Sequence, residues 1–403
     1  MASIPIQNWS LTHGPTQIPY PESPAPSEPE WPVPYGWARV YYATGQDHLT
    51  RPAIMADGFG FDASDPDELW YFGDGAGAEF PFFTRLRDSG FDLILVGYNR
   101  RGARIQDNAI AVMATIARAR ATRSDPRGMV VGGFSMGGLV TRYALTKMEY
   151  DEEQHDTAVY FSYDSPHRGA WIPISIQAFA HFVQPFASEP SKQINSPASR
   201  QLLWLHKPDL ISLPREDPLR TGFLAELAGY GDWPRRPRLR VAVANGSGDG
   251  QRNQLEPGVP NLETESEPLG VKLWVQDAGP RFKVAELRLG DFYPNLIYTS
   301  DLPRIDSAPG GMYPFFGYAA ENLRKMIPGL EVRCVWESVD FVPSVSAVSI
   351  RDLRTDDDLY VNIGQLPVSD SDLDDFRCSR TSTRHTHMTV DLGEFLLSQF
   401  RLE

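Results

Sequence analysis

Ser135 lies between two glycines in the run Gly133–Gly137, whose pattern is G-x-S-x-G. The apolar run Met129–Gly132 comes directly before it, and the helix-like stretch Leu139–Met148 comes directly after it. A serine at a sharp turn from strand to helix is typical of a nucleophile, because side chains at the flanking glycines would clash and the serine is held proud of the sheet. The helix N-terminus would also direct free N–H groups at the reacting centre. The pattern therefore predicts a nucleophilic Ser135, with a plain glycine-rich turn as the alternative.

Strand-like and helix-like stretches alternate over residues 36–166, on both sides of this serine. The strand-like runs are almost continuously apolar, which is typical of parallel strands buried on both faces by helices. The sequence therefore predicts an α/β fold with a mostly parallel sheet and helices on both faces. The predicted strands are Trp37–Ala43, Arg51–Ala56, Phe91–Gly97, Met129–Phe134 and Ala158–Tyr163, and the predicted helices are Asp107–Arg120 and Leu139–Met148.

Two segments depart from this alternation and are predicted as insertions in a domain that spans residues 36–403. Residues 170–236 contain the amphipathic stretch Trp171–Val183 and are predicted to form a helical lid or cap over the sheet. Residues 255–310 are predicted to form a small antiparallel β insertion, because polar and apolar residues alternate on both sides of a turn. The hairpin strands are predicted at Gly270–Val275 and Arg281–Leu289, further strands at Leu239–Ala244 and Val332–Trp336, and a closing helix at Leu392–Phe400.

The N-terminal segment, residues 1–35, holds nine of the 34 prolines of the chain. Proline lacks a backbone N–H and fixes φ, so this segment cannot form a helix or a central strand. It is therefore predicted to be an extended arm on the surface or plain disorder. The folded domain is predicted to start near Gly36.

Composition excludes several classes of protein. The 403 residues include 52 Asp and Glu against 38 Lys and Arg, and the resulting net charge of −14 argues against a general nucleic-acid binder. The two cysteines, Cys334 and Cys378, cannot form a disulfide framework or a cysteine-based zinc site. No apolar run reaches the roughly 20 residues of a membrane span, and no secretory signal is visible at the N-terminus. The expected location is therefore the cytoplasm.

Four motifs together resemble those of α/β-hydrolases of the lipase and esterase type. The first is the serine run already described. Asp57–Gly60 resembles the His-Gly-x-x loop that follows the third strand in these enzymes. Tyr98–Gly102 resembles their Asp-x-Arg-Gly turn after the fourth strand, and Ser162–Ala170 resembles the Thr-Pro-His-x-Gly-Ser stretch after the sixth.

The chain is also similar to a group of bacterial serine hydrolases over about residues 36–400. That group shares a Ser-Met-Gly-Gly-Leu-Val-x-Arg-Tyr-Ala helix, an Asp-Ser-Pro-His-x-Gly-Ala stretch, an Asn-Ser-Pro-Ala segment in the lid and a Phe-Val-Pro-x-x-Ser-Ala run. The corresponding residues here are Ser135–Ala144, Asp164–Ala170, Asn195–Ala198 and Phe341–Ala347. The resemblance does not identify a substrate.

The resemblance also implies an oxyanion hole made of two backbone N–H groups. One belongs to Met136, which follows the nucleophile, and the other to Phe59 in the loop after the third strand. Two fixed donors aimed at a developing alkoxide usually supply the largest catalytic effect. Asp57 departs from the family, because lipases often carry His at this position. The change affects how the loop is held and leaves the backbone donor in place.

The general base is expected late in the chain, because the order of the catalytic residues in this fold is Ser, acid, His. Among eight histidines, His385 and His387 precede the closing helix. The related hydrolases have a His-x-x-apolar-Thr pattern here, which selects His385, with His387 as the alternative. His167 and the neighbouring Arg168 are expected to hold their loop rather than to take part in the chemistry.

The acid is less sharply predicted than the other two residues. Asp164 ends the strand that follows the serine strand, Asp249 follows the next strand, and Asp340 precedes a Val-Pro pair that is similar to a lipase motif. Asp164 is the preferred triad acid, followed by Asp340 and then Asp249. Most aspartates at strand ends are turn or cap residues, which is the alternative for each.

These residues together predict a serine hydrolase that cleaves carboxylic esters through an acyl-enzyme. The same residues would serve a thioesterase or acyltransferase, and a non-catalytic binding protein on a hydrolase scaffold is the third possibility. The helical insertion predicts an apolar small-molecule ester or acyl substrate. No metal or organic cofactor is implied, and the oligomeric state is not predicted. The predicted substrate contacts are Ile176, Phe179 and Val183, which share helical spacing with Ile172, although plain core packing gives the same stripe.

Overall fold

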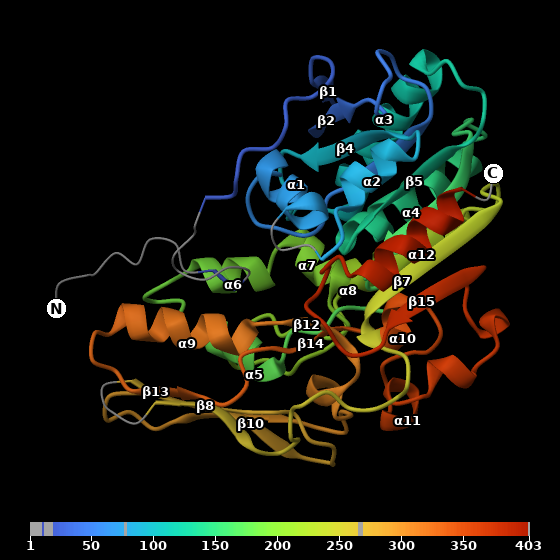
Figure 1. The fold of residues 1–403 in the computed structure, drawn as a ribbon. Coiled ribbons are helices and arrows are strands. Elements are labelled where there is room, and N and C mark those ends of the chain that lie inside the picture. Colours follow the sequence, from blue (N-terminus) through green and yellow to red (C-terminus); the bar gives the residue numbers. More distant parts are fainter. Residues whose placement is uncertain (1–9, 12–18, 76–78, 265–268, 402–403) are drawn as a thin grey trace.

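The computed structural model describes residues 10–11, 19–75, 79–264 and 269–401. An eight-stranded sheet forms its centre, with the order β1-β2-β4-β3-β5-β6-β7-β15 (Figure 1). The strands from β4 to β15 run parallel, whereas β1 and β2 are antiparallel to their neighbours. The chain therefore has the predicted α/β fold with a mostly parallel sheet. Its strands are β1 (Trp31–Val33), β2 (Gly36–Tyr41), β3 (Pro52–Ala56), β4 (Asp92–Tyr98), β5 (Met129–Phe134), β6 (Thr157–Tyr163), β7 (Leu239–Ser247) and β15 (Asp375–Ser379).

Helices cover both faces of this sheet, because its central strands are apolar on both sides. On β4, Ile94 and Val96 belong to the core cluster shared with the helices α3 (Ile105–Thr122) and α4 (Met136–Tyr150). The alternate residues Leu93 and Leu95 belong to a second cluster on the opposite face. That cluster includes side chains of α1 (Pro66–Asp74), α2 (Phe82–Asp88) and α12 (Val390–Phe400).

Four helices occupy the segment for which the sequence predicts a helical insertion, and they divide between two places. The first two helices, α5 and α6, pack on each other, and α5 also contacts the smaller sheet described in the next paragraph. The last two contact each other, and α8 packs on α4 of the central domain. The helices are α5 (Ile174–Phe182), α6 (Glu189–Ile194), α7 (Pro197–Leu202) and α8 (Pro218–Tyr230).

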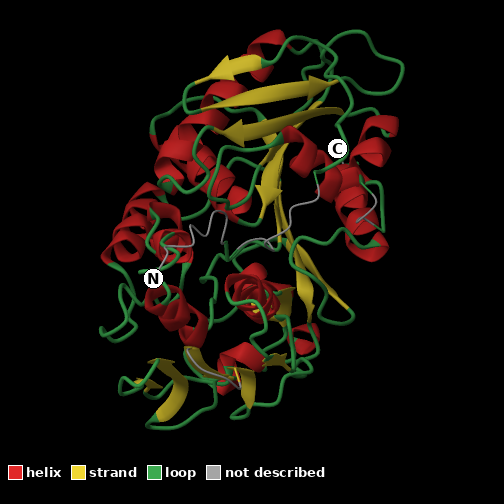
Figure 2. Cartoon of the chain, turned by 90° about the vertical axis from the view of Figure 1, so that its left-hand side faces the viewer, coloured by secondary structure: helices red, strands yellow, loops and turns green. Residues whose placement is uncertain are grey.

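The antiparallel insertion is larger than the predicted hairpin. It is a five-stranded sheet of order β11-β10-β9-β8-β13, separate from the large sheet (Figure 2). The hairpin between β9 and β10 could be recognised from the sequence, and in β9 buried and half-buried residues alternate. The five strands are β8 (Pro260–Thr264), β9 (Leu269–Trp274), β10 (Phe282–Leu289), β11 (Asn295–Thr299) and β13 (Val332–Cys334).

A two-stranded ribbon connects this insertion to the central domain. β12 (Gly310–Tyr313) pairs antiparallel with β14 (Val339–Pro343), and β12 also contacts β7 of the large sheet. The remaining elements are α9 (Phe315–Met326), α10 (Ser344–Ala347), α11 (Asp356–Leu359) and 3-10 turns at Ile305–Ser307, Ile363–Gln365 and Val368–Asp370.

The sheet begins before the position that the sequence predicts for the start of the folded domain. Strand β1 starts at Trp31, within the predicted arm, and pairs with β2 at the edge of the sheet. An edge strand tolerates prolines because one side of it needs no ladder partner. Near the N-terminus, Leu11 is also buried, and its N–H donates to Gln193 of α6 at 2.7 Å. Apart from Ser10 and Leu11, the residues of the arm before position 19 lie outside the described part of the chain.

Candidate active site

Ser135 lies at the turn between β5 and α4, in a conformation that side chains rarely adopt. Its φ is 53° and its ψ is −123°, so the backbone is strained there. The flanking glycines make this turn possible. A β-carbon at Gly137 would lie 2.3 Å from the carbonyl oxygen of Ala56, and one at Gly133 would lie 2.5 Å from the backbone of Gly137. The turn holds the serine hydroxyl at the carboxyl edge of the sheet, as the G-x-S-x-G pattern predicts.

The structure brings Ser135, His385 and Asp164 together in one chain of hydrogen bonds. The His385 Nε2 atom lies 2.8 Å from Oγ of Ser135, and its Nδ1 atom lies 2.6 Å from Oδ2 of Asp164. A carboxylate only accepts, so Nδ1 carries the proton toward Asp164 and Nε2 is left to accept the serine proton. All three residues are buried. The arrangement can remove a proton from the serine and hold the resulting imidazolium beside a negative charge.

Asp164 is fixed by backbone contacts at the end of β6. Its Oδ1 accepts the N–H of Asn245 at 2.9 Å, and its own N–H donates to the carbonyl of Val243 at 2.8 Å. Its φ of 48° turns the side chain back over the strand ends, a conformation that aspartate tolerates better than most residues. These bonds leave Oδ2 free to face the imidazole.

Neither of the two other candidate acids takes the place of Asp164 at the imidazole. Both ring nitrogens of His385 are already occupied, so Asp340 on β14 does not bond to the imidazole. The Asp340 carboxyl is fully buried, and its pKa is raised well above the usual value by burial, then by the negative charges of Asp164 and Asp306. The Asp249 carboxylate accepts the hydroxyl of Ser247 at 2.8 Å and the N–H of Gln251 at 2.9 Å. These contacts belong to a local turn.

The alternative base, His387, lies away from the serine. Its Nε2 faces the carboxylate of Glu79 at 3.4 Å. Its carbonyl accepts the hydroxyl of Tyr163 and the side-chain amide of Asn245, both at 2.8 Å. His387 therefore helps to fix the loop that carries His385.

The loop of His385 is held by the ribbon, which sequence reasoning did not connect with the site. The N–H of His385 donates to the carbonyl of Met312 on β12, and the N–H of Met312 donates to the carbonyl of Thr383, both at 2.8 Å. The ring of Phe341 on β14 stands edge-on to the imidazole, with centroids 4.8 Å apart. The Phe-Val-Pro run at 341–347 was the only sequence signal for the contact between Phe341 and His385. No pattern in the sequence links β12 to the histidine loop.

The predicted oxyanion loop lies directly beside the nucleophile. A β-carbon at Gly58 would be 3.3 Å from Cβ of Ser135. The carboxyl of Asp57 accepts the N–H of Gly58 at 2.6 Å and the hydroxyl of Ser64 at 2.5 Å. Burial raises the pKa of Asp57, and the nearby Arg101 opposes the rise. Phe59 follows in this loop, half-buried.

The other predicted oxyanion donor belongs to Met136, the first residue of α4. The first N–H groups of a helix have no partner within the helix, and the positive end of its dipole lies there. The N–H groups of Met136 and Phe59 remain predicted donors for the alkoxide.

His167 and Arg168 lie in a loop whose contacts are structural. The Nε2 of His167 lies 2.9 Å from Oγ of Ser162, and burial, then Arg142 and Arg168, lower its pKa well below the usual value. The guanidinium of Arg168 pairs with Asp372 at 2.7 Å. These contacts agree with the expectation that both residues hold the loop.

The predicted substrate contacts are buried in the core that α5 shares with the smaller sheet. Ile176, Phe179 and Val183 have no exposed surface and lie in one cluster with residues of β9, β10 and α9. Packing alone accounts for their helical spacing. Their contact with substrate remains a prediction.

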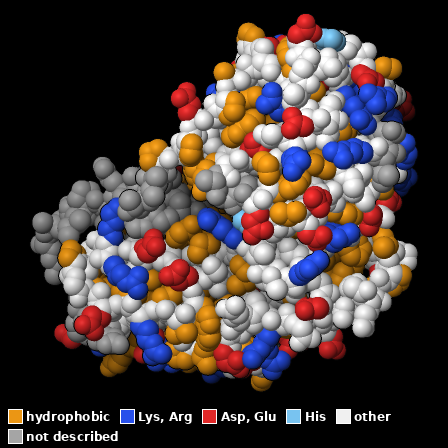
Figure 3. Space-filling view, viewed as in Figure 1, with side chains coloured by type: hydrophobic (Ala, Val, Ile, Leu, Met, Phe, Trp, Pro, Cys, Tyr) orange, Lys and Arg blue, Asp and Glu red, His pale blue; other side chains and the backbone are white. Residues whose placement is uncertain are grey.

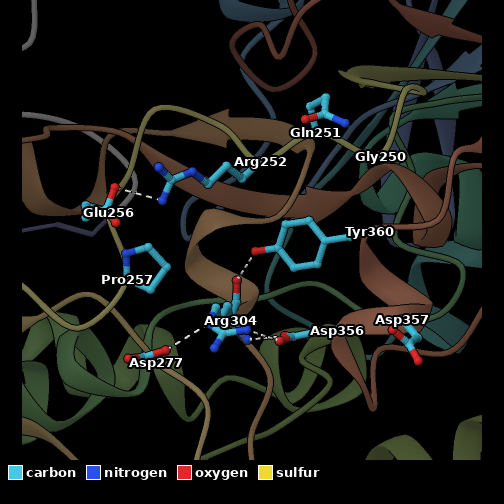
Figure 4. A pocket seen from close by; sticks show the side chains of 10 residues that line it. All are labelled: Gly250, Gln251, Arg252, Glu256, Pro257, Asp277, Arg304, Asp356, Asp357 and Tyr360. Carbon is cyan, nitrogen blue, oxygen red and sulfur yellow. Dashed lines mark hydrogen bonds and ion pairs between the residues drawn. The ribbon is translucent and has the colours of Figure 1, made fainter.

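A polar hollow of about 820 Å³ lies elsewhere, between the loop after β7 and α11 (Figure 4). Arg304 extends into it and pairs with Asp277 at 2.9 Å and with Asp356, and Tyr360 donates to the Arg304 carbonyl at 2.7 Å. None of the predicted catalytic residues lines this hollow. On the face shown in Figure 3, acidic and basic side chains are interspersed.

Within the described ranges, no cluster of three or more His, Cys, Asp or Glu side chains could hold a metal ion. In the same part of the chain, no helix is long and apolar enough to cross a bilayer.

Comparison with known proteins gives distant structural likenesses to bacterial and archaeal esterases and lipases. No family model and no curated protein matches the sequence. The Bacillus licheniformis lipase BlEst2 in its mature form has a TM-score of 0.33 and 12% identity, covering 56% of this chain and 74% of the lipase. The carboxylesterase EstE1 from a metagenomic library has a TM-score of 0.35 and 16% identity over 57% of this chain and 70% of that one. A hyperthermophilic esterase of the archaeon Pyrobaculum calidifontis has a TM-score of 0.35 and 13% identity over 54% and 64%.

Proposed function

We propose that this protein is a serine hydrolase that cleaves carboxylic esters through an acyl-enzyme on Ser135. The observation that carries the proposal is the chain of two hydrogen bonds, 2.8 and 2.6 Å long, from the Ser135 hydroxyl through His385 to Asp164. The strained serine at the start of α4 supports it, because a strained turn at a strand end is where such nucleophiles are found.

In the first half of the reaction, Oγ of Ser135 attacks the ester carbonyl while Nε2 of His385 takes the hydroxyl proton. The carbonyl oxygen becomes an alkoxide, which the N–H groups of Met136 and Phe59 stabilise. When the tetrahedral intermediate collapses, the bond to the alcohol oxygen breaks. The alcohol leaves with the proton from Nε2, and the acyl group stays on Oγ.

In the second half, water repeats the attack on the acyl-enzyme. Nε2 of His385 takes one water proton. When the new tetrahedral intermediate collapses, the bond to Oγ breaks, Nε2 returns the proton to Oγ of Ser135, and the free acid leaves. Asp164 stays ionised throughout and stabilises the imidazolium in both halves. The proposed substrate is a small apolar ester, with its acyl group against Ile176 and Phe179 of α5 and Val183 just after it.

A fluorophosphonate probe and a series of p-nitrophenyl esters test the proposal. We expect the probe to label Ser135 and the esters to be hydrolysed. In Ser135→Ala, labelling should be abolished and kcat should fall by at least about 10³-fold. Ser124→Ala, a loop serine bonded to His48, is the control that should retain both signals. Labelling of folded Ser135→Ala, or an unlabelled and inactive wild type, would contradict the proposal.

Acyl transfer uses the same acyl-enzyme and is separated by its products. An ester incubated with an added alcohol or amine should give mainly free acid if water is the acceptor. Predominant formation of the transferred ester or amide would assign the chain to the acyltransferases instead.

A further inference from the structure

Arg101 is a partly buried arginine beside the oxyanion loop, and the proposed catalytic steps do not use it. It comes from the turn after β4, and its side chain is only 13% exposed. Its guanidinium pairs with Glu68 of α1 at 2.8 Å and faces the carboxylate of Asp57 at 3.8 Å. Its Nε also donates to the carbonyl of Asp62 at 3.3 Å. The side chain therefore contacts the loop at both ends and joins it to α1.

The middle of the loop lies against the same guanidinium. A β-carbon at Gly60 would be 2.2 Å from Nε of Arg101, so only glycine lets the backbone approach this closely. The peptide that contains the N–H of Phe59 is one residue before Gly60. A displacement of Arg101 would therefore also displace the N–H of Phe59, which is the predicted oxyanion donor.

Asp57 transmits the same constraint to the other side of the loop. One of its carboxyl oxygens accepts the N–H of Gly58, whose own position is set against Ser135. Burial raises the pKa of both Asp57 and Glu68, and the positive charge of Arg101 opposes the rise in each. Without the guanidinium, the buried carboxyl of Asp57 and the half-buried carboxyl of Glu68 would lie near each other with no counter-charge, which is costly.

We propose that Arg101 is the positioning residue of the oxyanion loop: clamped by Asp57 and Glu68, it fixes the backbone at 57–60 so that the N–H of Phe59 meets the developing alkoxide. The inference rests on the proposed function and adds a role for Arg101, the partner of the aspartate that stands where lipases often carry histidine. Because residue 57 is an aspartate, the oxyanion loop can be held by Arg101. The arginine side chain lies against Asp57, Gly60 and Asp62 of that loop. Oxyanion donors must be held to within a few tenths of an ångström, which is what such a clamp provides.

The test compares Arg101→Gln with Arg100→Gln, because Arg100 is an exposed arginine in the same turn. We expect Arg101→Gln to lower kcat by about 10²-fold and to leave KM within about threefold, since the lost stabilisation exists only in the transition state. Binding of a trifluoromethyl ketone, which forms a tetrahedral alkoxide on Ser135, should weaken by a similar factor. Arg100→Gln should match the wild type in all three measurements.

A second variant keeps the test decisive if Arg101→Gln does not fold. Glu68→Gln leaves the arginine in place and removes one of its two carboxylates, so a smaller loss of about tenfold in kcat with unchanged KM is expected. The proposed role of Arg101 would be overturned if a folded Arg101→Gln kept a kcat within about threefold of the wild type. If only Glu68→Gln folds, the same result in that variant would overturn it. A wild type that neither hydrolyses esters nor reacts with the probe would instead overturn the proposed function.

Discussion

Gly311 lies so close to Asp164 that a β-carbon on the glycine would be 1.9 Å from the carboxylate oxygen Oδ2. That oxygen is the one that bonds to the imidazole of His385. The next residue, Met312, accepts the N–H of the same histidine. Strand β12 therefore lies against the acid and holds the base, and it leaves no room for a side chain between them.

Gly311→Ala should displace the carboxylate of Asp164 and lower kcat by at least about 10²-fold, because the orienting carboxylate is worth about 10⁴-fold in related triads. The matched control is Gly222→Ala in α8, where a β-carbon meets nothing within 4 Å. That control should keep its activity and gain stability, because alanine is about 1 kcal/mol better than glycine inside a helix. Ester hydrolysis and thermal unfolding of both variants are the measurements. Full activity in folded Gly311→Ala would mean that the ribbon does not support the site.

The identity of the acid is tested by three asparagine variants, which keep the shape and remove the charge. Asp164→Asn should lower kcat by about 10⁴-fold, whereas Asp249→Asn in its surface turn should change kcat little. Asp340→Asn should also stay active, because its carboxyl does not bond to the imidazole. All three rates are to be measured at one pH with folding checked by circular dichroism. An active Asp164→Asn beside an inactive Asp340→Asn would reverse the assignment.

Stability should fall with rising pH because of Asp306. Its carboxyl is fully buried and accepts the indole N–H of Trp171 at 2.6 Å and the N–H of Gln276 at 2.7 Å. Burial raises its pKa from 3.8 to about 6, and these two donors oppose the rise. The folded state therefore binds the proton more tightly than the unfolded state. The stabilisation is complete below about pH 4 and is lost as the pH rises through about 6.

Asp306→Asn removes this titration, so the comparison with the wild type isolates it. Relative to the variant, the wild type should lose roughly 2–4 kcal/mol of unfolding free energy between pH 4 and 7, with little change above that. Urea unfolding at several pH values measures the difference. A constant difference across the range would show that Asp306 keeps an ordinary pKa.

The role of α5 in binding the acyl group is tested by replacing a large apolar side chain of the helix with alanine. If its apolar side contacts the acyl group, Phe179→Ala should shift the preference toward longer acyl chains. Phe316→Ala in α9 is the matched control, because Phe316 is equally buried in the same core cluster. Both variants should lose about 3–5 kcal/mol of stability. If both keep the same chain-length profile, α5 is ordinary core.

The central sheet and the serine turn could be predicted because their signals are local. The five strands predicted between residues 36 and 166 correspond to β2 to β6, since buried parallel strands are continuous apolar runs. Strand β15, Asp375–Ser379, could not be recognised in the same way. It lies at the edge of the sheet and is mostly polar, so its pairing with β7 depends on contacts distant in sequence.

The site shows the same division between local and distant information. The order of motifs led to Ser135, His385 and Asp164, which the structure places in one hydrogen-bond chain. The contact of Met312 with the histidine loop joins residues about 70 positions apart and leaves no periodic trace. The β insertion was underestimated for a related reason, because β8 and β11 are short and each alternates too briefly to be recognised.

The attachment of the His385 loop to β12 affects the temperature at which the protein loses activity. The ribbon of β12 and β14 has only two strands, and a two-stranded ribbon is marginal unless other parts of the structure support it. When it opens, the imidazole loses its backbone anchor, although the eight-stranded sheet and its covering helices are untouched. Catalytic power would then disappear at a lower temperature than helical structure, as in proteins whose weakest cooperative unit carries the chemistry.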